Sequence, residues 1–357
     1  MKTLILTGGG TAGHVTPALA LLPDLKKHFD RIVFVGSKNG IERELVAKCG
    51  LEFYYVPTVK LERKFTLKNA LIPFKLWLGI SEAKKLLYEL NPTAVFSKGG
   101  FVSLPTVIAS KKLGIPVALH ESDLSVGLAN KIGAKFAEVF LTSFDQTKTN
   151  CKKTVFTGSP LRPDLFEKKD NTALLKKYRL SGRKKILLVF GGSSGSQIIN
   201  KTLEKCLYKL INRYEVVHIC GKDKGENQTE KGYVKMQFCQ DISELFYLAD
   251  LVVSRAGANS LFELTALRKP TLAIPLSSKN SRGDQIENAE YFKKRKMIEV
   301  LSEDDLTENT LYSAILKLET NAENLAQSCK AQATPSANKK IAEIICNLGD
   351  KDTVFKK

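Results

Sequence analysis

Two glycine-rich loops in this chain have residue types that suit phosphate binding. Residues 8–13 follow the apolar run 4–6, and residues 191–195 follow the apolar run 186–190. Glycine lets a backbone turn tightly and approach a ligand, and the N-terminus of the helix that follows offers N–H groups and partial positive charge to phosphate. One such loop in each half predicts two nucleotide-fold domains and one phosphorylated ligand held between them.

The first loop matches two known fingerprints incompletely. Gly8-x-Gly10-x-x-Gly13 has the spacing of a dinucleotide site, but residues 35–38 (VGSK) lack the acid that such a site needs after its second strand. His14-Val15 stands where a P-loop requires Lys-Ser or Lys-Thr. We therefore expect a loop that faces phosphate or sugar, with a purely structural turn as the alternative.

His14, directly after this loop, is the best candidate for a general base. We expect it at the start of the next helix, where the helix N-terminus disfavours the cation and keeps the ring able to accept a proton. A helix-start histidine satisfied by local hydrogen bonds would explain the same position. His120-Glu121, at the end of another strand, forms the rival pair, and His28 and His218 are expected at the surface and in the core.

Polar residues also follow two predicted strands of the second half. Small residues at 256–258 permit close backbone approach, and a helix beginning near Asn259 would aim its N–H groups at an anion. Glu263 lies one turn further, where it could hold a ribose diol or act as a dipole partner. The cluster of residues 284, 285 and 288 would fall on one side of a first helical turn, and it could read sugar hydroxyls or cap the helix.

Metal ligands are not predicted. The seven cysteines are scattered without a Cys-x-x-Cys pair, which indicates reduced usage. Asp350 and Asp352 lie in a charged tail instead of after a buried strand. We expect no metal and no cofactor, so that helix dipoles and Arg162 neutralise a diphosphate.

The chain carries a formal charge of +18, which suits nucleic acid, an anionic lipid surface or merely a lysine-rich proteome. Residues 60–85 interleave cations with apolar and aromatic side chains, among them Phe65, Phe74, Lys75 and Trp77. This pattern predicts contact with anionic lipid, and a helix buried in the first core is the alternative. Nucleic acid is not expected because no binding module accompanies the charge. The N-terminal apolar stretch is too short for a signal peptide, and no run reaches membrane-spanning length.

Short apolar runs alternate with helical patterns throughout, which predicts an α/β chain with parallel sheets wrapped by helices. Turn formers at residues 157–163 mark the division. We expect a first domain over 1–160, a second over 161–334, and a terminal helix within about 335–357.

Eight short motifs follow one another in a recognisable order. They are 8–20 (GGGTAGHVTPALA), 98–103 (KGGFVS), 120–121 (HE), 127–131 (GLANK), 158–162 (GSPLR), 191–195 (GGSSG), 254–258 (SRAGA) and 284–289 (DQIENA). Together they resemble the MurG family, which adds N-acetylglucosamine to the lipid-linked muramyl-pentapeptide precursor of peptidoglycan. The resemblance implies a GT-B fold, in which two Rossmann-like domains face each other across a cleft and a C-terminal helix packs back on the first.

The same resemblance implies substrate contacts, mainly with UDP-GlcNAc on the second domain. Ser193 and Arg162 would contact the diphosphate, and Ile242, in a loop, would approach uracil through its backbone. Glu263 would hold the ribose. Backbone N–H groups would come from Ala258, Asn259 and Ser260, sugar contacts from Asp284, Gln285 and Asn130, and the acceptor side of the site from Thr11, Ala12 and Gly13.

Two positions depart from the family pattern. Ala12 stands where a further glycine is frequent, and Asp284 where His or Gln is frequent, which weakens that sugar contact. We expect an inverting, metal-independent transferase with His14 as base, peripheral on the cytoplasmic face of the membrane, with a polyprenyl-diphosphate-linked muramyl-pentapeptide as acceptor. A GT-B enzyme acting on diacylglycerol, and a protein that binds or hydrolyses nucleotide sugars, are the alternatives.

Overall fold

The computed structural model describes residues 1–58, 72–192, 195–279, 281–332 and 336–349. They form two compact units. The first combines Met1–Arg162 with the C-terminal segment that starts at Ser336, and the second begins at Pro163. The chain thus changes unit at Arg162, within the run of turn formers and two residues beyond the expected boundary.

The first unit is built on a parallel sheet in the order β3-β2-β1-β4-β5-β6-β7. Its strands are β1 (Thr3–Thr7), β2 (Arg31–Gly36), β3 (Glu52–Tyr55), β4 (Ala94–Ser97), β5 (Val117–Glu121), β6 (Val139–Thr142) and β7 (Thr154–Phe156). Its helices are η1 (Ala12–His14), α1 (Thr16–Leu19), α2 (Leu22–Leu25), α3 (Ile41–Ala47), α4 (Ile72–Leu90), α5 (Leu104–Lys112), α6 (Leu128–Gly133) and α13 (Asn338–Gly349).

Both faces of this sheet are covered, because successive side chains of a strand point to opposite faces. Leu4 and Leu6 pack in one core with α2 and α13, whereas Ile5 packs in the other with α4 and α5. The inner strands therefore have apolar residues at consecutive positions, as at residues 4–6 of β1, and the unit has three layers, helix on sheet on helix.

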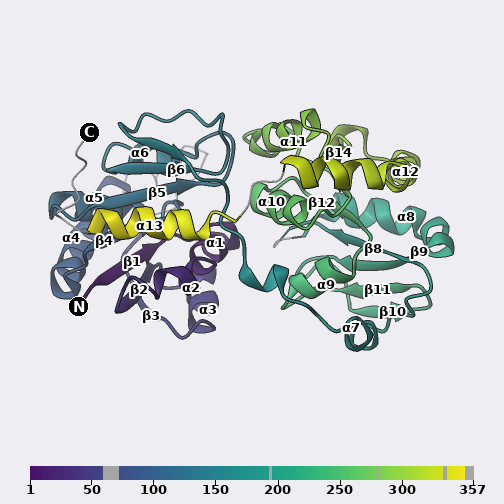
Figure 1. Cartoon of the computed structure of the whole chain (residues 1–357), viewed down its shortest axis with the longest axis horizontal. Helices are drawn as coiled ribbons and strands as arrows, with labels where there is room; N and C mark the ends of the chain where they lie inside the picture. Colours follow the sequence, from purple (N-terminus) through teal and green to yellow (C-terminus); the bar gives the residue numbers. More distant parts are fainter. Residues whose placement is uncertain (59–71, 193–194, 280, 333–335, 350–357) are drawn as a thin grey trace. The chain divides into compact units, whose positions relative to one another are not determined.

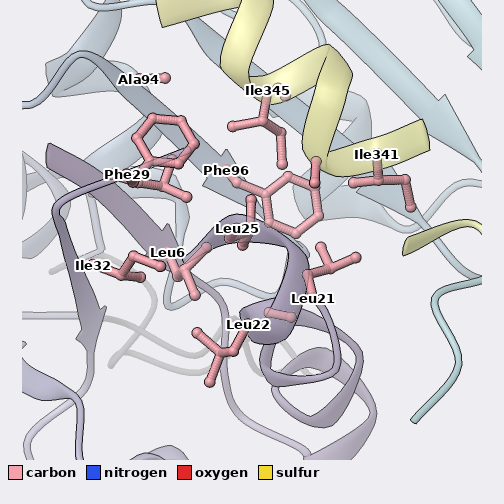
Figure 2. Packing of buried hydrophobic residues seen from close by; sticks show 14 of the residues in the cluster. Leu6, Leu21, Leu22, Leu25, Phe29, Ile32, Ala94, Phe96, Ile341 and Ile345 are labelled. Carbon is pink, nitrogen blue, oxygen red and sulfur yellow. The ribbon is translucent and has the colours of Figure 1, made fainter. Parts of the chain in front are cut away.

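Helix α13 completes the first core from the far end of the sequence. Ile341 and Ile345 are fully buried, and their side chains point toward Leu6, Leu25 and Phe96 (Figure 2). The helix lies along β4 and α2 (Figure 1). The last helix of the described residues is therefore part of the first unit.

The second unit repeats this plan with strand order β10-β11-β9-β8-β12-β13-β14. The strands are β8 (Lys185–Phe190), β9 (Tyr214–Ile219), β10 (Gln228–Glu230), β11 (Tyr233–Met236), β12 (Leu251–Ser254), β13 (Thr271–Ala273) and β14 (Glu299–Val300). The helices are η3 (Pro163–Phe166), α7 (Asn171–Lys177), α8 (Gln197–Arg213), α9 (Ile242–Leu248), α10 (Ala258–Ala266), α11 (Asp284–Lys294), η4 (Glu303–Asp305) and α12 (Glu308–Gln332).

Two layers of helices cover the second sheet as well. Leu187 and Val189 of β8 pack toward α8 and α12, and Leu188 and Phe190 pack toward α9. The predicted parallel α/β architecture is confirmed. One strand differs, because β10 pairs antiparallel with β11 across a short turn and closes the edge of the sheet.

Candidate active site

The loop that follows β1 brings four of the predicted residues together. Thr11 is exposed, and Ala12, Gly13 and His14 are half-buried. These last three form the 3-10 helix η1, so His14 ends a 3-10 turn instead of starting an α-helix as we expected. The physical reason is Pro17, which stands in the first turn of α1 and starts a separate helix there.

Hydrogen bonds fix the ring of His14. Its Nδ1 lies 3.1 Å from the carbonyl oxygen of Gly9 and 3.1 Å from Oγ1 of Thr11. A carbonyl can only accept, so Nδ1 carries the proton and a neutral ring has its lone pair on Nε2. In the neutral ring Nε2 is therefore the nitrogen able to accept a proton, and the contact that sets this tautomer is local and not a helix N-terminus.

Glu42 holds the glycine loop from below. Its buried carboxylate accepts hydrogen bonds from the N–H of Gly10, at 3.3 Å, and from the N–H of Ser37, at 3.0 Å. Cβ atoms added at Gly9 and Gly36 would lie 2.7 Å and 2.8 Å from Glu42 side-chain atoms, so these glycines make room for the carboxylate. Glu42 was not among the predicted site residues, and an acid in the first turn of α3 is the signal that could have indicated it.

A second loop, after β4, touches the first. A Cβ added at Gly100 would lie 2.4 Å from the carbonyl oxygen of Gly9 and 3.2 Å from Nδ1 of His14. Gly100 has φ +80°, a conformation that glycine adopts at little cost. Residues 98–100 therefore form the wall against which the His14 loop packs.

The rival pair His120-Glu121 lies behind this wall and is buried, at 0% and 5% exposure. Burial holds the pKa of His120 well below its usual value, and the nearby Lys98 charge lowers it further. Glu121 accepts hydrogen bonds from the N–H groups of Ser122 and Gly127 and from Nδ2 of Asn130, at 2.9 to 3.0 Å. These contacts make the pair a support for the loops and disfavour it as the base.

Asn130, predicted to read the donor sugar, is 4% exposed. Its Nδ2 also donates to the carbonyl oxygen of His120, at 3.2 Å, and a Cβ added at Gly99 would lie 2.6 Å from its Oδ1. Its visible contacts therefore organise the loops after β4 and β5.

In the second unit, α10 begins where β12 ends. Gly257 is its N-cap residue and brings no side-chain acceptor, so the first-turn N–H groups of Ala258, Asn259 and Ser260 can serve an anion. Glu263, one turn later, is half-buried. The start of α10 at Ala258 agrees with the helix expected to begin near Asn259.

Arg255 ties the loops around α10 together. It is 7% exposed, forms an ion pair with Glu303, and donates to the carbonyl oxygen of Ile274, at 3.1 Å, and to Oγ of Ser196, at 2.7 Å. Ser196 caps α8 directly after the second glycine loop. This role of Arg255 was not predicted, and a cation directly after the buried strand β12 is the signal that could have indicated it.

The other residues predicted to contact the donor lie partly where we expected them and partly elsewhere. Ile242 is the first residue of α9, capped by Asp241, and not part of a loop. Asp284 and Gln285 open α11 as expected, but Oε1 of Gln285 accepts from the N–H of Leu276, at 3.1 Å. Asn288 is fully buried, and its Nδ2 donates to the carbonyl oxygen of Ala256, at 3.4 Å.

Arg162 is the half-buried last residue of its stretch of the first unit. Ser193 and Phe65, together with the rest of the basic segment 59–71, lie outside the described residues.

The described part of the basic amphipathic segment is α4, which has two faces. Ala83 and Leu87 are buried, whereas Phe74 and Trp77 are 62% and 63% exposed. Their rings stack with centroids 6.1 Å apart, and Lys75 between them is exposed. Burial in the core thus explains one face of α4 and leaves the aromatic pair at the surface.

Among the described residues, no group of three or more His, Cys, Asp or Glu side chains is placed to hold a metal ion. None of the helices in that part of the chain is long and apolar enough to cross a membrane.

Comparison with known proteins shows the family to which this chain belongs. Residues 4–142 match the glycosyltransferase family 28 N-terminal domain, and residues 186–345 match its C-terminal domain. A protein of Clostridium botulinum strain Langeland is 42% identical over 97% of this chain and 99% of its own length. Another, from Clostridium perfringens strain SM101, is 42% identical over 96% of this chain and 97% of its own. Both are named UDP-N-acetylglucosamine–N-acetylmuramyl-(pentapeptide) pyrophosphoryl-undecaprenol N-acetylglucosamine transferase. The chain belongs to glycosyltransferase family 28 and, within it, to the MurG family.

Solved structures agree on the fold of this MurG-family chain. The crystal structure of Acinetobacter baumannii MurG matches with a TM-score of 0.73 and 23% identity, over 97% of this chain and 99% of the other. The calicheamicin glycosyltransferase CalG4 matches with a TM-score of 0.67 and 13% identity, over 98% and 99%. The fold is GT-B, with two Rossmann-like domains.

Proposed function

We propose that this chain transfers N-acetylglucosamine from UDP-GlcNAc to the 4-hydroxyl of the lipid-linked N-acetylmuramyl-pentapeptide, a step of peptidoglycan synthesis. The observation that carries the proposal is 42% identity over 97% of the chain with relatives named for that transfer. The arrangement of His14 on its glycine loop supports it chemically.

The reaction is an inverting displacement at the anomeric carbon. The acceptor hydroxyl oxygen forms a bond to the anomeric carbon while the bond between this carbon and the UDP oxygen breaks. UDP departs with the electron pair of the broken bond. The hydroxyl proton goes to Nε2 of His14, whose Nδ1–H is held by the carbonyl oxygen of Gly9. The ring becomes a cation while the hydrogen bond to Gly9 keeps its orientation.

The donor is bound mainly by the second unit. First-turn N–H groups of Ala258, Asn259 and Ser260 and the guanidinium of Arg162 stabilise the charge that develops on the diphosphate, by dipoles and cations set in place before the substrate arrives. Glu263 holds the ribose diol, Ile242 approaches uracil through its backbone N–H, and the sugar is read from the start of α11, at Asp284 and Gln285. Ser193 contributes from the second glycine loop.

The acceptor is embedded in a membrane, so the enzyme must work at a lipid surface. The exposed pair Phe74 and Trp77, with Lys75 between them, suits insertion into the headgroup region of anionic lipid. We place this contact on the cytoplasmic face, where UDP-GlcNAc is available, and no nucleic acid takes part.

The decisive experiment measures UDP release from UDP-GlcNAc by the purified protein, with and without a chelator. It compares a muramyl-pentapeptide diphosphoryl lipid, diacylglycerol and no acceptor. Release that requires the muramyl lipid is the expected result. Release with diacylglycerol would move the chain to glycolipid synthesis, release without acceptor would make it a hydrolase, and loss of transfer with the chelator would contradict metal independence.

A further inference from the structure

A buried lysine lies behind the His14 loop, outside the contacts that the transfer uses. Lys98 directly follows β4 and is 2% exposed. Its Nζ lies 2.6 Å from Nδ1 of His120 and 2.6 Å from Oγ of Ser122. Removing an amine from water is costly unless it is hydrogen-bonded, so these two contacts must offset the cost of burying Lys98.

The two contacts of His120 assign its protons. Nε2 lies 3.4 Å from the carbonyl oxygen of Gly158, which can only accept, so Nε2 carries a proton. Burial keeps the ring neutral, as its lowered pKa indicates, and Nδ1 therefore has the lone pair. Lys98 donates to that lone pair in either of its own charge states.

The amine of Lys98 can exist in both states near neutral pH. Burial lowers its pKa to about 7, and the charges of Glu121 and Asp123 oppose this shift. A neutral amine still has two protons, one for His120 and one for Ser122. Lys98 therefore keeps both contacts whether it is charged or neutral, and it can hold His120 and Ser122 in place in either state.

We propose that Lys98 is a positioning residue of the transferase: it locks His120 in the Nε2–H tautomer and ties Ser122 to β4. The role rests on the proposed function, because the geometry it protects is that of the His14 loop. Lys98 is too buried to contact substrate, so it acts through its neighbours.

The protected geometry reaches His14 through Gly8. A Cβ added at Gly8 would lie 3.3 Å from Cβ of Lys98 and 2.6 Å from the carbonyl oxygen of His14, so the backbones of the two loops are in contact. The carboxylate of Glu121 accepts a hydrogen bond from the N–H of Ser122, at 2.9 Å, and so fixes the start of the loop that follows β5. Loss of the amine would free this loop and His120 and would loosen the wall behind the base.

The tautomer can be observed without any activity. The chain has four histidines, so selective ¹⁵N-histidine labelling gives a simple spectrum, and the signals that vanish in His120→Gln identify the residue. We expect a protonated Nε2 and an unprotonated Nδ1 between about pH 6 and 8. An imidazolium or an Nδ1–H tautomer in the wild type would overturn the proposal.

The variant Lys98→Met keeps the length of the side chain and removes the donor. We expect kcat for the muramyl lipid to fall about 10- to 100-fold, the KM for UDP-GlcNAc to change little, and the His120 signals to broaden or shift as the tautomer is released. A folded variant with wild-type kcat, or with unchanged His120 signals, would contradict the role.

Lys269→Met is the matched control. Its ammonium donates to the carbonyl oxygens of Tyr247 and Ala249, at 3.0 and 2.8 Å, in the second unit, and its loss should leave kcat unchanged. Should Lys98→Met not fold, Ser122→Ala removes one acceptor alone; it should lower kcat with the His120 tautomer kept, and an unchanged kcat would overturn the proposal. If the wild type transfers nothing, the proposed function fails while the spectrum still tests the tautomer.

Discussion

The side chain of Asn338 forms hydrogen bonds with both backbone groups of Leu161. The side-chain Oδ1 accepts from the N–H of Leu161, at 3.0 Å, and Nδ2 donates to its carbonyl oxygen, at 2.9 Å. Nδ2 also donates to the carbonyl oxygen of Ala20, at 3.0 Å. One buried amide thus joins the start of α13, the η1–α2 region and the end of the first stretch of its unit.

Asn338→Ala should therefore be costly. It would leave a buried N–H and two carbonyls without their partner, and we expect the free energy of unfolding to fall by about 2 to 4 kcal/mol. Urea titration followed by circular dichroism measures the change. Lys339→Ala, which alters the exposed neighbour on the same helix, is the control and should change stability by less than about 0.5 kcal/mol; equal losses would contradict the specific role of Asn338.

His14→Ala tests the base. Removing a general base typically costs about 10²- to 10⁴-fold in rate, and we expect that loss in kcat with the Kd of UDP-GlcNAc unchanged. His28→Ala changes an exposed histidine of the same unit and should have wild-type kcat. If His14→Ala retained near-normal turnover, another group would have to take the proton.

The pH dependence of stability should carry the mark of His218. Burial, aided by the charge of Lys235, lowers its pKa to about 4, while Glu204 opposes the shift. Above about pH 6.5 the ring is neutral in both folded and unfolded chains, and its contribution is constant. As the pH falls from 6.5 to 4, the unfolded chain binds a proton that the folded chain does not, so stability falls, by about 3 kcal/mol for this group.

Comparing wild type with His218→Gln isolates this effect. The glutamine can still meet Tyr233 and Asn200, which contact the ring at 2.9 and 3.0 Å, but it does not titrate. Urea titrations at pH 7, 5.5 and 4.5 should show a steeper loss for the wild type. Parallel curves would mean that His218 is protonated in the folded protein.

The aromatic face of α4 predicts lipid binding. Phe74→Ser combined with Trp77→Ser should weaken binding to phosphatidylglycerol vesicles about 10- to 100-fold, because two exposed apolar side chains are lost. Cosedimentation measures the change, and circular dichroism checks the fold. Tyr208→Ser removes an aromatic ring that is 62% exposed on α8 and should bind vesicles like the wild type; an equal loss there would place the contact elsewhere.

The sequence predicted the features that depend on residues close together in the chain, such as strands and the loops after them. Burial on both faces of a sheet requires apolar strands such as β1 and β8, and glycines predicted the loops after them. The packing of the C-terminal helix on the first unit was expected only from the family resemblance. The details of the site depend on contacts distant in sequence. Residue 98 entered the sequence analysis only as part of a motif, because its contact with His120 depends on the neighbouring strand β5. Asn338 likewise contacts Leu161, 177 positions away in the sequence.

Two misplacements have nearby causes. Pro17 restarts the helix after His14 and leaves that residue in a 3-10 turn, and Asp241 caps α9 one residue before Ile242 and draws it into the helix. Both signals were readable.

The ribose contact of Glu263 can be tested on the nucleotide alone. Glu263→Ala should weaken UDP binding about 10-fold or more, since a hydrogen bond to a charged group contributes about 1.5 to 3 kcal/mol. Calorimetric titration with 2′-deoxy-UDP separates this contact from general damage. If the carboxylate holds the 2′-hydroxyl, the wild type should lose affinity for the deoxy nucleotide and the variant should bind both nucleotides alike. Glu287→Ala, at an exposed acid in the first turn of α11, should behave like the wild type. A variant that still prefers UDP over its deoxy form would move the ribose contact away from Glu263.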